Sequence, residues 1–76
     1  MVTEQHIMSV IDSRSFMSVN DIVNALVGFV PELKSRKRPV ADVSPLVFRM
    51  YSDGKLERRD GVGSRGGWGY RRSFVL

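Results

Sequence analysis

The chain has 76 residues, no cysteine and one histidine, and its 12 Lys and Arg outnumber its 8 Asp and Glu, so the net charge is +4. This length allows one small domain, so we expect residues 1–76 to form a single domain. The missing cysteines exclude disulfides and thiolate metal sites, and a lone histidine excludes a two-histidine metal site. We therefore expect no metal, no cofactor and no enzymatic activity.

No segment predicts insertion into a membrane. The longest apolar run, residues 25–30, is far shorter than the roughly 20 residues that span a bilayer. Residues 1–5 lack the basic and apolar regions of a targeting signal. We therefore expect a cytoplasmic protein that does not contact membranes.

The charge is divided unevenly along the chain. Residues 1–33 carry one base and four acids, a net charge of −3, whereas residues 34–76 carry eleven bases and four acids, a net charge of +7. Such asymmetry indicates one cationic side of the molecule. Nucleic acid, an anionic membrane and an acidic protein are all partners that this side suits.

The first half of the chain predicts two helices with a short strand between them. Thr3 is a suitable N-cap for a helix that continues to about residue 13, with apolar residues at three- and four-residue spacing. Residues 15–17 are short and apolar, as in a strand of minimal length. Ser18, followed three residues later by an acid, predicts the start of a second helix that ends within residues 28–31.

A basic segment separates this half from a third helix. Residues 31–41 begin with a proline and contain another, so we expect a loop with at most one helical turn around Leu33. Ser44 is a good N-cap, and Pro45 suits the first helical turn, where its missing N–H costs nothing. The third helix is therefore predicted over about residues 44–53. Its apolar stripe is expected to consist of Val43, Leu46, Val47, Met50 and Tyr51.

The remainder of the chain predicts a β-hairpin. Residues 55–59 and 68–72 alternate as strands do, and the glycine-rich stretch 60–67 forms the tip between them. Trp68 and Tyr70 are expected to anchor the hairpin to the core.

These elements resemble a known family. Residues 43–59, followed by residues 66–71, are similar to the recognition helix and the wing of the winged helix-turn-helix DNA-binding superfamily. The resemblance implies an α+β fold of three helices followed by a two-stranded wing. It also implies a small transcriptional regulator that binds double-stranded DNA, with the third helix in the major groove and the wing on the backbone or minor groove.

Carried over residue by residue, the resemblance assigns a set of contacts to DNA. The positions expected to face the major groove are Ser44, Phe48, Arg49 and Ser52. The positions expected to contact phosphates are Lys34, Arg36, Lys37, Arg38, Arg58, Arg59, Arg71 and Arg72. Arg65 at the wing tip is expected to reach the minor groove.

Other interpretations remain open at this stage. Phe48, or the apolar tail of residues 74–76, is a candidate contact for a homodimer or a protein partner. The same fold could serve as an adaptor for an acidic protein. The Arg, Gly and aromatic residues of the hairpin also suit RNA or single-stranded nucleic acid.

Overall fold

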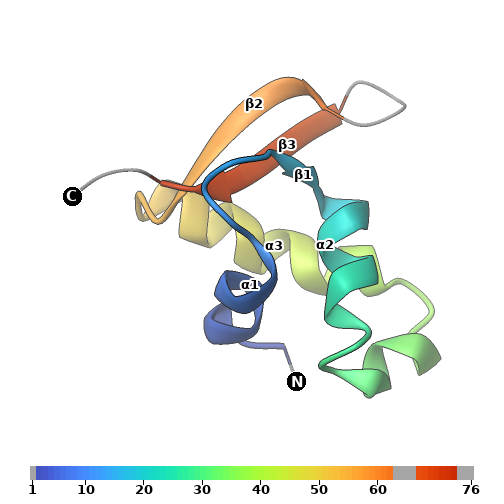
Figure 1. Cartoon of the computed structure of the whole chain (residues 1–76). Helices are drawn as coiled ribbons and strands as arrows, with labels where there is room; N and C mark the ends of the chain where they lie inside the picture. The colour runs from blue at the N-terminus through green and yellow to red at the C-terminus, as the bar shows by residue number, and fades with distance from the viewer. Residues whose placement is uncertain (1, 63–66, 74–76) are drawn as a thin grey trace.

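The computed structural model describes residues 2–62 and 67–73 as a small α+β fold (Figure 1). The elements in chain order are α1 (Glu4–Val10), β1 (Met17–Ser18), α2 (Val19–Leu26), the 3-10 helix η1 (Pro31–Ser35), α3 (Pro39–Ser52), β2 (Leu56–Val62) and β3 (Gly67–Arg72). The predicted α+β class and the order of helices before a hairpin are confirmed.

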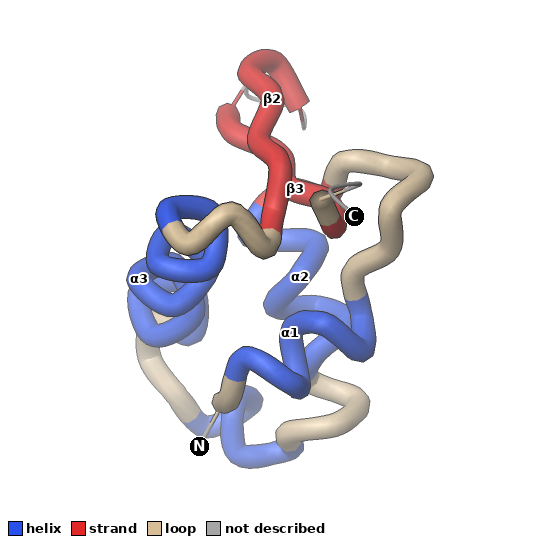
Figure 2. Tube along the Cα trace, turned by 90° about the vertical axis from the view of Figure 1, so that its left-hand side faces the viewer, coloured by secondary structure: helices blue, strands red, loops and turns tan. Residues whose placement is uncertain are grey.

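The sheet has three antiparallel strands in the order β1-β3-β2, and the helices lie together on one side of it (Figures 1 and 2). The expected two-stranded sheet is therefore incomplete, because β1 adds a third strand by pairing Met17 with Tyr70 and Ser18 with Gly69. The start of α2 is therefore connected to the hairpin by strand pairing, because Ser18 of β1 is also the N-cap of α2.

Local signals explain where the first two helices begin and end. Capping boxes start both: Thr3 with His6 in α1 and Ser18 with Asp21 in α2. α1 ends at Val10, earlier than predicted, because the chain then turns around Asp12. The backbone N–H groups of the residues at 14 and 15 donate to the Asp12 carboxylate, and these bonds lower the pKa of Asp12.

The third helix begins at Pro39, not at Ser44 as predicted. A proline does occupy the first turn, but it is Pro39 rather than Pro45. Pro45 lies inside the helix, where it cannot donate to the carbonyl four residues earlier. Burial of the opposite helix face offsets this loss, since three of its residues are fully excluded from solvent. Most of the expected loop is therefore helical, as η1 and the first turn of α3.

A single core joins the helices to the sheet, and no side chain among residues 2–62 and 67–73 is both polar and fully buried. Leu56 of β2 and Tyr70 of β3 extend the helical core into the sheet. The largest fully buried side chains are Ile7, Ile11, Ile22, Leu26, Val43, Val47 and Met50.

Candidate nucleic-acid interface

The outer face of α3 collects the predicted groove-facing residues. Phe48, Arg49 and Ser52 are exposed, and Ser44 is half-buried at the edge of this face. Phe48 is 54% exposed, an unusual fraction for so large an apolar side chain. The buried stripe of α3 lies on the opposite side of the helix, so the helix turns these four residues away from the core.

A stack of aromatic rings and one arginine connects α3 to the hairpin. The Arg58 guanidinium carbon lies 4.2 Å from the ring centroid of Tyr51 and 4.1 Å from that of Trp68. We call Tyr51, Arg58 and Trp68 the arginine stack. Phe48 continues it along α3, with its ring centroid 6.2 Å from that of Tyr51. The outer face of α3 and the hairpin therefore share one surface.

The two aromatic residues expected to anchor the hairpin behave differently. Tyr70 is 6% exposed and packs with its ring against Tyr51, as predicted. Trp68 is 48% exposed, so the expectation of a core position is wrong. Trp68 lies near the tip end of β3, and it packs on Arg58 rather than among the apolar side chains of the helices.

Two of the predicted phosphate contacts are engaged inside the molecule. The Arg71 Nε donates to the Glu57 Oε2 at 2.5 Å, and its guanidinium lies 4.4 Å from the centroid of the Phe16 ring. The Arg72 side chain donates to the carbonyl of Met8. The pair with Glu57 joins β3 to β2, and the bond to Met8 joins β3 to α1. The contact with Phe16 joins β3 to the segment between α1 and β1. Arg59 lies farther from Phe16, at 5.9 Å from the ring centroid.

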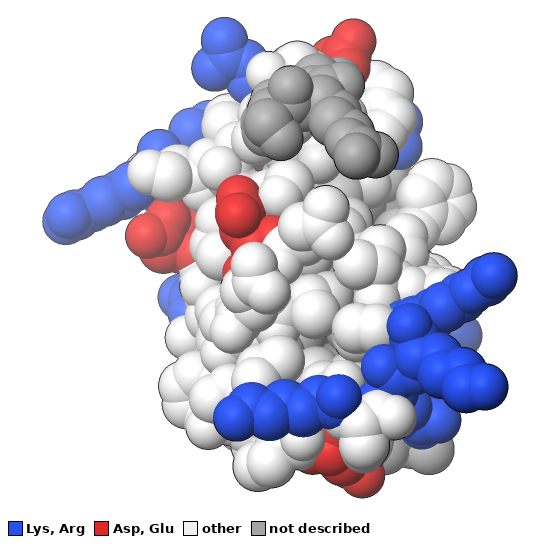
Figure 3. Space-filling view, turned by 90° about the vertical axis from the view of Figure 1, so that its right-hand side faces the viewer, with Lys and Arg blue, Asp and Glu red and all other residues white. Residues whose placement is uncertain are grey.

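The basic segment before α3 is exposed and lies apart from the sheet. Arg36 pairs with Asp42 at 3.5 Å, whereas no ion pair within the described ranges engages Lys34, Lys37 or Arg38. Figure 3 shows a dense group of Lys and Arg at its lower right, where η1 leads into α3. In Figure 2 the same link lies at the lower end of α3, and the hairpin lies at the upper end.

The residues predicted to contact phosphates therefore lie in separate regions of the molecule. Lys34, Lys37 and Arg38 lie at the N-terminal end of α3, and Arg58 lies beside its C-terminal end. Arg71 pairs with Glu57 within the hairpin, and Arg72 contacts the carbonyl of Met8 in α1. Arg65 and the apolar tail, residues 74–76, lie outside the described residues.

Sequence reasoning missed the role of Tyr51, which was expected only as part of the apolar stripe of the third helix. A signal for it was present in the period of the strands. Leu56 of β2 is buried, so Arg58 two residues later lies on the same, helix-facing side of the sheet. The residue opposite Arg58 across the ladder is the buried Tyr70. This pattern predicts that Arg58 faces the end of α3, where its guanidinium packs on the ring of Tyr51.

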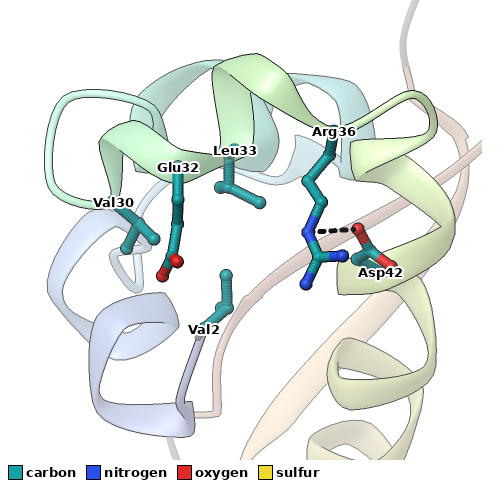
Figure 4. A pocket seen from close by; sticks show the side chains of 6 residues that line it. All are labelled: Val2, Val30, Glu32, Leu33, Arg36 and Asp42. Atoms are coloured by element: carbon teal, nitrogen blue, oxygen red, sulfur yellow. Dashed lines mark ion pairs between the residues drawn. The ribbon is translucent and has the colours of Figure 1, made fainter.

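A cavity of about 200 Å³ lies at the other end of the molecule, between the N-terminal segment, η1 and the start of α3 (Figure 4). Its polar wall includes Glu32 and the Arg36–Asp42 ion pair, and Val2, Val30 and Leu33 form the apolar part. The cavity shares Arg36 with the basic segment before α3.

Within residues 2–62 and 67–73 we find no group of three His, Asp or Glu arranged to hold a metal ion. Over the same residues no helix combines the length and the apolar character needed to cross a bilayer. Comparison of the chain with protein families, with curated proteins and with solved structures finds no match.

Proposed function

We propose that this protein binds double-stranded DNA in the manner of a winged helix, with α3 in the major groove and the β2–β3 hairpin against the adjoining backbone. The order of three α-helices followed by a hairpin supports this proposal, since the winged helix has the same order. A role as a small transcriptional regulator is part of the proposal.

The observation that carries the proposal is the position of cations at both ends of a helix that has one exposed face. Lys34, Lys37 and Arg38 precede α3, and Arg58 stacks on Tyr51 in its last turns. The helix has 14 residues and is therefore about 21 Å long. The major groove is about 12 Å wide and admits a helix, whose diameter is about 10–12 Å. Cations at the two ends of α3 are then available to contact the phosphate backbones that border the groove.

The physical basis of affinity is the release of counterions. Each lysine or arginine that neutralises a phosphate frees condensed cations, so the affinity falls steeply as salt rises. Arg49 is exposed on the outer face of α3. We expect it to contact the backbone or a base edge, since an arginine fork pairs well with guanine. Arg71 and Arg72 are left out of the proposed interface because their guanidinium groups already have partners.

The test is a titration of the full chain with labelled duplex DNA at several salt concentrations. We expect log affinity to fall linearly with log salt, with a slope that indicates several phosphate contacts. Arg49→Ala is expected to weaken binding severalfold. Arg14→Ala is the matched control, because the segment between α1 and β1 lies on the side opposite α3 (Figure 2). Equal losses in the two variants, or no salt-sensitive binding at low salt, would contradict the proposal.

One observation favours a second candidate, the binding of single-stranded nucleic acid. Trp68 is half-exposed beside an arginine, as are side chains on which unpaired bases stack. Titration with single-stranded DNA and RNA, followed by the fluorescence of this sole tryptophan, separates the two candidates. Tighter binding and stronger quenching by single strands than by duplex would favour the second.

A further inference from the structure

The outer face of α3 contains a stripe of residues with little hydrogen-bonding capacity. Ala41, Pro45, Phe48 and Ser52 follow one another at intervals of four, three and four residues, which places them in one line along the helix. All four are exposed, so this line forms the ridge of the helix farthest from the core. Only Ser52 has a polar side chain.

The chemistry of the major groove limits what such a stripe can recognise. Base edges in the groove present hydrogen-bond donors and acceptors, together with one apolar group, the 5-methyl of thymine. An alanine, proline or phenylalanine side chain has neither donor nor acceptor and can recognise only the methyl group. A duplex whose groove lacks these methyls would leave Phe48 against polar edges or water.

We infer that the Ala41–Pro45–Phe48 stripe contacts thymine 5-methyl groups, so that the preferred ligand of this protein is duplex DNA rich in thymine along one groove. The inference rests on the proposed function and adds the class of sequence bound. Arg49 and Ser44, beside the stripe, contribute hydrogen bonds to neighbouring bases or phosphates.

Charge supports DNA rather than an apolar protein surface as the occupant of this face. Lys34, Lys37 and Arg38 at one end of the stripe are exposed cations, and Arg58 lies beside its other end. An apolar protein bound to the stripe would offer no anionic partner to these cations at its two ends. The phosphates of a duplex lie on both sides of the groove floor, so one ligand satisfies both the stripe and its ends.

The experiment compares duplexes that differ only in the methyl group. One has thymine, the second has deoxyuridine at every thymine, and each is about two helical turns long. Deoxyuridine keeps the same base pairing and groove acceptor but lacks the methyl group. Burying one methyl group changes an affinity by roughly fourfold, so we expect the wild-type chain to prefer the thymine duplex by about fourfold or more.

Two variants assign the preference to the stripe. Phe48→Ala is expected to reduce the ratio of the two affinities to less than about twofold, since it removes the largest apolar contact. Phe29→Ala is the matched control. Phe29 is 61% exposed, similar to Phe48, but lies in the turn between α2 and η1. It is expected to keep the wild-type ratio. Because both side chains are exposed, circular dichroism is expected to show unchanged folding.

The outcomes separate this inference from the proposed function. Salt-sensitive binding that is equal for the thymine and deoxyuridine duplexes overturns the inference and leaves the proposed function standing. An unchanged ratio in Phe48→Ala, or an equal change in Phe29→Ala, also overturns it. A wild-type chain that binds no duplex at low salt overturns both.

Discussion

At the scale of the residue, Arg58 shows how a surface cation is held in place. Its guanidinium lies between the rings of Tyr51 and Trp68, which restrict the side chain while leaving its N–H groups at the edge of the plane. Cation–π contacts of this kind are worth about 0.5–2 kcal/mol each, depending on exposure. A side chain already ordered loses less entropy when it binds a phosphate, which favours affinity.

Replacing Arg58 therefore tests the interface at one position. We expect Arg58→Ala to weaken duplex binding and to reduce the slope of log affinity against log salt by about 0.9, the value for one phosphate contact. Fluorescence anisotropy over a salt series measures both quantities. Arg71→Ala removes the same charge from the same hairpin, but its guanidinium is paired with Glu57. Equal changes of slope in both variants would show that Arg58 makes no direct contact.

At the scale of the element, the hairpin depends on Gly69, because a larger side chain at this position of β3 would clash with β2. The register of β2 and β3 shifts between Arg59 and Val62, as in a β-bulge, and Gly61 in this stretch has a φ of 81°. Across the ladder, a Cβ built on Gly69 would lie 2.6 Å from the Cβ of Val62. The side chain of Val62 occupies the space that any larger residue at position 69 would need.

Substitution of this glycine is expected to destabilise the fold. Gly69→Ala forces the strands apart, and overpacking of this kind costs about 1–3 kcal/mol. The midpoint of chemical denaturation measures the loss. Gly67→Ala in the same strand is the control, since a Cβ there meets nothing within 4 Å. If the two variants were equally stable, the contact between Gly69 and Val62 would not constrain the hairpin.

At the scale of the whole molecule, the basic half of the chain does not form one continuous patch. Over the part of the chain that the structure describes, Lys34, Lys37 and Arg38 before α3 take part in no ion pair, and Arg58 lies beside the end of α3. Arg71 and Arg72 instead contact Glu57 of β2 and Met8 of α1. Lys55 pairs with Glu4 at 2.6 Å and is likewise engaged within the fold. The net charge therefore overstates the number of cations free to meet a polyanion.

The group before α3 is expected to supply a large share of the salt dependence. Simultaneous replacement of Lys34, Lys37 and Arg38 by alanine should lower the salt slope by about 2.7, three times the value for one contact. Stability should hardly change, because these side chains are exposed. Thermal unfolding checks the second expectation. A slope equal to that of the wild-type chain would place the DNA elsewhere on the molecule.

Much of the architecture was predictable because its signals are local. Capping residues at Thr3 and Ser18 start the first two helices, and the two alternating segments pair as a hairpin. The expected tip, residues 60–67, was too long, because β2 continues to Val62 and β3 begins at Gly67. The start of α3 was predicted five residues late, since a serine–proline pair at 44–45 offered a local start as good as the true one at Pro39. Local preference alone does not choose between two such starts.

Sequence by itself determined the α+β class, the order of the helices and hairpin, the buried stripe of α3 and the excess of cations in the second half. Tertiary structure alone decided which of those cations are engaged, because partners such as Glu57 and Met8 come from other elements of the fold. It also decided that β1 joins the sheet and that Arg58 stacks on Tyr51 and Trp68. Periodicity reports which side of an element is apolar, whereas pairing between elements depends on how they pack in space.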